Sequence, residues 1–193
     1  MSKERYESKE RIHDRNKILC NKIFARLSKR NKGKCLILDA ETLQTTKALH
    51  KVGFKYSDII IPNPYCYKTL KKRIPKTIEL YDVFLGDYIN SYKGYTRTFK
   101  NAWFDYCGIF EGSVECNPKD DIANYFQKYL PSKGVFAITF KTGRNAKDYL
   151  YQDIIEADCY IQETAYQSGY VLVKAGQRFY KGMCFMIYKV SER

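Results

Sequence analysis

Polar side chains follow a short apolar run near the start of this sequence, at a place where they could hold a ligand. Residues 34–38 are mostly apolar, and the run stops at Asp39, Ala40 and Glu41. Carboxylate oxygens accept hydrogen bonds from hydroxyl and amino groups. Residues 39–41 therefore form the first candidate ligand-binding stretch, provided that the run ends where ligands bind.

Three later apolar runs are also stopped or interrupted by polar residues. In chain order these are Asn63 after residues 59–61, Gly86 and Asp87 after residues 83–85, and Asp105 with Tyr106 within residues 102–110. Each of these runs supplies at least one amide or carboxylate. If the four runs are strands that point the same way, their polar ends should meet at one edge of a sheet.

The apolar runs predict buried parallel strands. Runs of this length without polar alternation are typical of strands covered on both faces, and such strands belong to parallel sheets packed between helices. The intervening stretches carry helix signals. Within residues 42–53, for example, Thr42 is expected to cap a helix and Gly53 to end it. Ligands of open parallel sheets bind at the carboxyl ends of the strands, which is where these polar groups should converge.

Periodicity along the whole chain predicts an α/β fold. The predicted strands are residues 34–39, 58–61, 83–85, 102–110, 134–140, 169–174 and 183–190. The predicted helices are residues 12–30, 42–53, 66–78, 117–130 and 146–168. The last two strands are joined by a short connection, so they should pair antiparallel. We expect a Rossmann-like three-layer sandwich with a mostly parallel seven-stranded sheet that ends in an antiparallel C-terminal hairpin.

The length of 193 residues suits one folded domain. We divide it into a basic N-terminal segment with its leading helix, residues 1–33, and the α/β domain proper, residues 34–193. No apolar run approaches the roughly 20 residues that span a membrane, and the N-terminus lacks the apolar centre of a secretory signal. We therefore expect an intracellular protein, cytoplasmic or nuclear, without a membrane partner. The oligomeric state stays open.

The charge balance favours a polyanionic partner. Thirty-four Lys and Arg residues against 21 Asp and Glu give a formal charge of +13, and nucleic acids bind such proteins with release of counterions. Cations and aromatic rings alternate at Tyr92, Lys93, Tyr95 and Arg97, a pattern that suits base stacking and phosphate contact. The alternatives are a surface that confers solubility and a loop with partly buried rings.

Two further cations follow the predicted strand 134–140. Lys141 and Arg144 should lie at the same edge of the sheet as the acids, where they could meet a substrate phosphate or simply be exposed. The seven cysteines are odd in number and form no CxxC pair, and the two histidines lie far apart. We therefore expect reduced thiols, with neither a disulfide framework nor a metal site.

The order of these elements resembles the class I S-adenosylmethionine-dependent methyltransferase family. Five β-α repeats followed by a terminal hairpin cover about residues 17–190. In that family the cofactor S-adenosylmethionine lies over the carboxyl ends of the first four strands. The resemblance implies that the cofactor is bound by the polar residues at these ends, namely Asp39, Ala40, Glu41, Asn63, Gly86, Asp87 and Asp105. Carboxylates there would complement the cationic sulfonium and ammonium groups.

The resemblance also implies catalytic roles. Amino-group methyltransferases of nucleic acids carry an acid or amide, two prolines and an aromatic residue after the fourth strand, and Asp105 and Tyr106 occupy that place without the prolines. They would orient a target amine and stack on a base for direct in-line transfer. The sequence departs from the family after the first strand, where Asp39-Ala-Glu-Thr-Leu-Gln44 has no glycine in place of a glycine-rich turn.

Three functions remain open from the sequence. The first is methyl transfer from S-adenosylmethionine to RNA or DNA. The second is a catalytically inactive protein of the same fold that binds nucleic acid or acts as a scaffold, since fold alone does not establish activity. The third is a methyltransferase of small molecules or proteins whose basic surface is incidental.

Overall fold

A computed structural model describes residues 15–91, 99–112, 116–128, 132–142 and 147–193, with side chains in the last range from residue 152 onward. Within these residues seven strands form one sheet in the order β3-β2-β1-β4-β5-β7-β6. All pairs from β3 to β5 are parallel, and β7 pairs antiparallel with both β5 and β6. This arrangement confirms the predicted sheet, including the C-terminal hairpin.

The strands in chain order are β1 (Lys34–Ile37), β2 (Ile59–Pro62), β3 (Glu79–Tyr81), β4 (Phe99–Ile109), β5 (Lys133–Lys141), β6 (Tyr170–Tyr180) and β7 (Met183–Glu192). The helices are α2 (Arg15–Ser28), α3 (Gln44–Lys51), the 3-10 turn η2 (Tyr56–Asp58), α4 (Tyr67–Arg73), α5 (Leu85–Ser91), α6 (Pro118–Lys128) and α7 (Lys147–Gln167). No helix among the described residues is long and apolar enough to cross a membrane.

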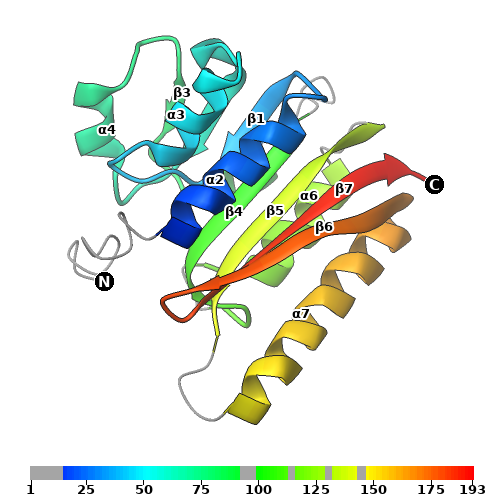
Figure 1. The fold of residues 1–193 in the computed structure, drawn as a ribbon. Coiled ribbons are helices and arrows are strands. Elements are labelled where there is room, and N and C mark those ends of the chain that lie inside the picture. Colours follow the sequence, from blue (N-terminus) through cyan, green and yellow to red (C-terminus); the bar gives the residue numbers. More distant parts are fainter. Residues whose placement is uncertain (1–14, 92–98, 113–115, 129–131, 143–146) are drawn as a thin grey trace.

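Two helical layers cover the two faces of the sheet (Figure 1). Phe24 of α2, Leu49 of α3 and Leu70 of α4 belong to one apolar cluster, and α2 crosses in front of β4 and β5. Helices α5, α6 and α7 contribute to a second cluster on the opposite face. Successive strand side chains alternate between these clusters, as strand geometry requires. Residues 15–28 thus pack on the same sheet as the rest of the chain.

The central strands show why the sequence folds this way. Trp103 of β4 is fully buried toward α2, its ring centroid lies 5.3 Å from that of Phe24, and its indole N–H donates to Thr139 Oγ1 at 2.9 Å. The next residue, Phe104, faces the other layer and packs edge-on against Phe136. Long apolar strands with both faces covered therefore account for the unbroken apolar runs of the sequence.

The third strand differs from the prediction. Residues 83–85 are not a strand. Strand β3 lies earlier, at Glu79–Tyr81, and residues 85–91 form α5. Leu85, Tyr88 and Ile89 are buried together, which is helical spacing, whereas β3 is a short edge strand whose side chains are only partly buried. Gly86 and Asp87 consequently begin a helix and do not end a strand.

Gly134 provides a test of the β4–β5 pairing. A Cβ atom there would lie 2.1 Å from the backbone carbonyl oxygen of Lys100, closer than any non-bonded contact allows. We expect Gly134→Ala to lower the free energy of unfolding by about 1–3 kcal/mol, because the strands must separate. Urea denaturation measures this. Gly108→Ala is the control, since no atom lies within 4 Å of that Cβ position; equal stability of the two variants would contradict the proposed clash.

Candidate functional site

A cavity of about 590 Å³ lies at the carboxyl ends of the parallel strands. Its wall includes Leu38 after β1, residues 62–65 at the end of β2, residues 84–87 before and within α5, and residues 106–109 of β4. Residues 116–118, 120 and 121, at the start of α6, complete this part of the wall. Strands β1 and β4 are neighbours although they are far apart in sequence, so the winding of the sheet reverses between them. Ligands of open α/β sheets bind in the crevice outside such a reversal.

The wall combines apolar surface with acids. Leu38, Phe84 and Ile109 contribute apolar side chains, and Asp87 and Asp120 are exposed carboxylates of α5 and α6. Helix α6 begins at the cavity because Asn117 caps it: the Asn117 side-chain oxygen accepts the backbone N–H of Asp120 at 3.3 Å. The cavity therefore offers a site for a ligand with a flat apolar group and hydrogen-bond donors.

Asp121 is the buried acid of the cavity. Its Oδ2 accepts a hydrogen bond from the Tyr106 hydroxyl at 2.6 Å, which fixes the Tyr106 ring against α6. Burial raises the pKa of Asp121 to about 6, against the opposing effect of the Tyr106 hydrogen bond and with added repulsion from Asp120 and Asp87. A Cβ at Gly86 would lie 2.5 Å from Asp121 Oδ1, so a residue without a side chain lets α5 approach α6 here.

The turn after β1 is held together by Asp39. This residue is buried, and its carboxylate accepts the backbone N–H groups of Ala40 at 3.1 Å and Thr46 at 2.7 Å. Burial raises the pKa of Asp39, although the hydrogen bonds from Thr46 lower it. Thr46 lies in the first turn of α3, so Asp39 satisfies a helix N-terminus. Asp39, Ala40 and Glu41 do not line the cavity; their neighbour Leu38 does.

The start of α3 differs from the sequence prediction. Thr42 is not the cap of α3. The N-cap residue is Leu43, which makes no side-chain cap and has φ 53° and ψ 39°. A left-handed non-glycine residue costs about 1 kcal/mol or more, and burial of Leu43 in the α2–α4 cluster offsets that cost. The hydrogen-bond acceptor that a capping side chain would offer to the first backbone N–H groups of α3 is supplied by the Asp39 carboxylate.

Asn63 ties the first two strand ends together and also lines the cavity. Its side-chain amide donates to the backbone oxygen of Asp39 at 3.0 Å, and its side-chain oxygen accepts the backbone N–H of Cys66 at 3.3 Å, next to the start of α4. The sequence identified this residue as a ligand candidate. Its hydrogen bonds show that it also joins the turn after β1 to the segment that leads into α4.

Asp105 and Tyr106 point to opposite faces of β4. Tyr106 lines the cavity, whereas Asp105 faces α2 and forms an ion pair with Lys17. The Lys17 ammonium also lies over the Trp103 ring at 4.6 Å and the Tyr180 ring at 5.7 Å. Burial lowers the pKa of Lys17, but the adjacent Asp105 carboxylate raises it by more, so the pKa of Lys17 lies above its usual value. Alternation along a strand separates these two neighbours in sequence.

The remaining predicted residues are only partly covered by the structure. Lys141 is half-buried at the end of β5, on the expected edge. Tyr92, Lys93, Tyr95, Arg97 and Arg144 lie outside the described residues. Sequence reasoning missed Lys17, Phe84 and the start of α6. The start of α6 could have been found from the sequence, because a helix that follows a parallel strand begins at the edge of the sheet where the strands end. Among the described residues, no group of three His, Cys, Asp or Glu is placed to hold a metal ion.

Comparisons with known proteins find the fold in solved structures. No family model matches this chain, and the search of curated proteins finds no significant match. An O-methyltransferase family protein from Burkholderia thailandensis superposes with a TM-score of 0.58 at 13% identity, over 95% of this chain and 62% of that one. Trm1 from Pyrococcus horikoshii, solved with S-adenosyl-L-methionine, gives 0.64 at 8% identity, over 91% and 54%.

A third structure is the fibrillarin pre-rRNA processing protein of Methanococcus jannaschii, with a TM-score of 0.58 at 10% identity, over 86% of this chain and 70% of that one. The chain thus spans less than two thirds of the length of the first two proteins. At these identities the likeness shows a shared fold. The predicted Rossmann-like methyltransferase fold is confirmed.

The acid Asp121 predicts a pH dependence of stability. Its folded-state pKa of about 6 lies above its unfolded value of about 4, so the folded state binds the proton more tightly. The stability from this group is therefore present below about pH 4 and is lost as the pH rises to about 6, by about 3 kcal/mol. We expect the difference in unfolding free energy between wild type and Asp121→Asn to change by this amount across that range in urea titrations.

The Asp82→Asn variant is the control for that experiment, because Asp82 is an exposed acid that does not line the cavity. Its unfolding free energy should follow the wild-type pH profile. A constant difference between wild type and Asp121→Asn at all pH values would contradict the raised pKa.

The Lys17–Asp105 pair predicts energetic coupling between α2 and β4. Both side chains are largely buried, at 15% and 21% exposure, so removal of one leaves the other charge without its partner. We expect the double variant Lys17→Met/Asp105→Asn to be more stable than the two single effects predict, with a coupling of about 1–3 kcal/mol. A double-mutant cycle in urea measures it, and strictly additive effects would show that the pair contributes no coupling.

Proposed function

We propose that this chain is an S-adenosylmethionine-dependent methyltransferase that transfers the methyl group directly to a nucleic acid, RNA or DNA. The observation that carries the proposal is the cavity between the ends of β1, β2 and β4 and the start of α6, in a sheet of order 3-2-1-4-5-7-6. A structural neighbour of the same fold was solved with S-adenosyl-L-methionine, which supports this choice of cofactor.

The residues of the cavity fit such a cofactor. Its volume of about 590 Å³ is within the range of about 300–1,000 Å³ typical of small-molecule sites. Leu38, Phe84 and Ile109 would cover the purine ring, and Asp87 and Asp120 would accept hydrogen bonds from its amino group or from ribose hydroxyls. When bound, S-adenosylmethionine supplies a methyl group activated by attachment to a positively charged sulfur.

The chain would then contribute orientation and electrostatics. Tyr106 lines the cavity with its ring fixed by Asp121, so we propose it as the aromatic contact for a target base. Asp105 does not line the cavity, and it would instead support the site by joining the end of β4 to α2 through its ion pair with Lys17. Residues 39–41 would support the site through the turn that Asp39 closes, whereas Asn63, Gly86 and Asp87 belong to the wall itself.

The positive net charge of the chain supports a nucleic-acid substrate. The formal charge of +13 favours a polyanion, and one structural neighbour is a pre-rRNA processing protein. A protein or small-molecule substrate would not need this excess of cations. The proposal therefore gives nucleic acid preference over those two substrate classes.

The turn after β1 favours a second candidate, a protein of this fold that binds nucleic acid without catalysis. Both Asp39 oxygens accept hydrogen bonds within the protein, and the turn contains no glycine that would let its backbone approach a ligand closely. Such a protein would bind oligonucleotides but neither S-adenosylmethionine nor its product.

Titration calorimetry with S-adenosylmethionine and S-adenosylhomocysteine tests the cofactor. We expect both ligands to bind, and Asp87→Ala to weaken the binding at least tenfold, about 1.4 kcal/mol, because the variant removes a cavity acceptor. The control Asp82→Ala removes an exposed acid that does not line the cavity and should bind as the wild type does. No heat at millimolar ligand would exclude the enzyme and leave the second candidate.

Transfer of a labelled methyl group to separate pools of RNA, DNA and protein tests the substrate. Label should enter RNA or DNA. Label found in protein alone would instead identify a protein methyltransferase with an incidental basic surface.

A further inference from the structure

Charge is divided between the two helical layers. Every charged side chain of α2, α3 and α4 is a Lys or an Arg. On the other face of the sheet, the only charged residue of α5 is Asp87, and α6 has two lysines and two aspartates. Helix α7 carries five acids, Asp148, Asp153, Glu156, Asp158 and Glu163, against a single lysine. Helices α2, α3 and α4 are therefore strongly positive, whereas α5, α6 and α7 together carry more acids than lysines.

The outer cations of the basic layer have no acidic partners among the described residues. Six exposed side chains define this surface, which we call the basic face: Lys22 and Arg26 of α2, Lys51 of α3, and Lys68, Lys72 and Arg73 of α4. None of the ion pairs found in the described part of the chain includes any of them. Their positive charge is thus available to an external anion.

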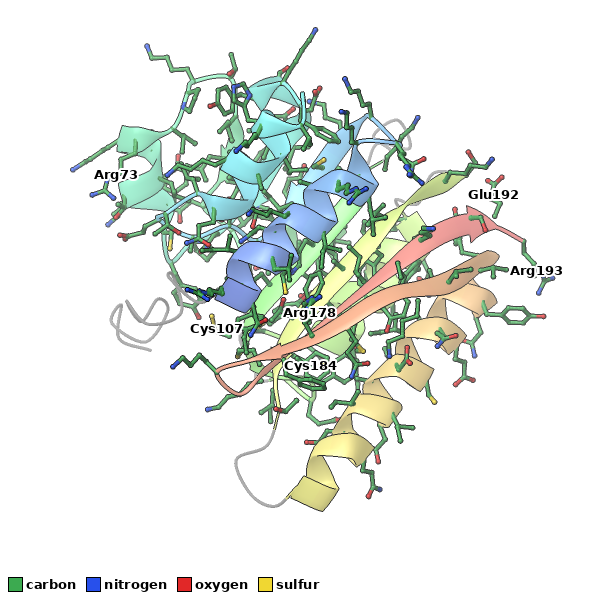
Figure 2. The ribbon with its side chains drawn as sticks, in the orientation of Figure 1. Arg73, Cys107, Arg178, Cys184, Glu192 and Arg193 are labelled. Atoms are coloured by element: carbon green, nitrogen blue, oxygen red, sulfur yellow. The ribbon has the colours of Figure 1, made fainter. Side chains whose placement is uncertain are left out.

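The three helices lie beside one another on one face of the sheet (Figure 1), and Arg73 projects from the outer end of α4 in Figure 2. All three begin at the carboxyl edge of the sheet. Lys17, in the first turn of α2, pairs with Asp105, and α4 follows directly on cavity residues 62–65. Of the basic face, Lys68 in the first turn of α4 lies nearest this edge, and the other cations follow the helices away from it. A long polymer bound along the basic face could therefore reach the cavity mouth at the start of α4.

We propose that the basic face binds the phosphate backbone of the nucleic acid and presents it to the cavity from the α2–α4 side. Regularly repeated phosphates match several spaced cations, and release of their counterions drives binding. The acids of α7 repel the same backbone on the opposite layer. The inference rests on the proposed function for the identity of the target, but the binding itself needs no catalysis.

A lipid surface fits the basic face less well. Helices that lie in a membrane interface insert large apolar side chains beside their cations. On α2, α3 and α4 the only large apolar residue that is exposed, in the described part of the chain, is Ile18 at 38%. The surface thus has the charge for a polyanion without the apolar residues that would anchor it in lipid.

Fluorescence anisotropy of the full chain with labelled single-stranded RNA and DNA oligonucleotides, at a series of salt concentrations, tests the proposal. The variant Lys68→Gln/Lys72→Gln/Arg73→Gln should bind at least tenfold more weakly at low salt. Affinity falls as salt rises, and the plot of log affinity against log salt should be less steep for this variant by about 2. This value corresponds to three lost phosphate contacts at about 0.7 each. The RNA and DNA arms show which backbone is preferred.

The matched control Lys128→Gln/Lys133→Gln/Lys189→Gln removes the same charge from three exposed lysines on α6, β5 and β7. It should stay within about twofold of the wild type, since these side chains lie outside the basic face. Equal losses in the two triple variants would overturn the proposal in favour of diffuse charge. Binding to anionic vesicles without binding to oligonucleotides would overturn it in favour of a membrane.

Calorimetry with S-adenosylmethionine on the same samples separates this inference from the proposed function. Normal cofactor binding by the α4 triple variant shows that it is folded. If oligonucleotides bind the basic face but no cofactor binds and no methyl group is transferred, the proposed function fails while this inference holds. If cofactor binds and methyl transfer proceeds equally in both triple variants, the inference fails alone.

Discussion

The parallel pairing of β1 with β4 is the constraint on which the rest of the structure depends. Leu36 pairs with Ala102 and Ile37 with Trp103, and the backbone N–H of Leu38 extends the pairing to the Trp103 oxygen at 3.1 Å. The chain first builds β2 and β3 on one side of β1 and then returns to add β4 on the other. Because the connections leave in opposite directions, a crevice remains above this pair, and the cavity occupies it.

Buried polar groups stabilise the edge of that crevice. Asp39 accepts backbone donors at the start of α3, and its own carbonyl oxygen accepts the Asn63 amide from the next strand end. A buried polar group without a partner costs about 1–3 kcal/mol, so this network specifies one conformation of the turn. The structure thus assigns to Asp39 and Asn63 a task in shaping the site that their residue types alone do not reveal.

The sequence predicted those parts of the fold that local pattern determines. Strands β1, β2, β4 and β5 are buried on both faces and therefore appear as unbroken apolar runs. Strand β3 was missed because an edge strand of three residues, including Glu79 and Tyr81, carries no such run. The Lys17–Asp105 pair joins residues 88 positions apart, and only the packing of α2 on β4 brings them together. No local pattern contains that information.

The cavity and the basic face carry opposite charges. The protein as a whole is strongly cationic, yet its cavity is lined by the carboxylates of Asp87, Asp120 and Asp121. At an ionic strength near 0.15 M, charges are screened beyond about 8 Å, so each ligand group responds mainly to its immediate surroundings. Phosphates are repelled at the cavity and attracted to the helices beside it, whereas a cationic small molecule experiences the reverse. In the proposed function, a polyanion on the basic face and a cationic cofactor in the cavity would therefore bind next to each other without competing for one site.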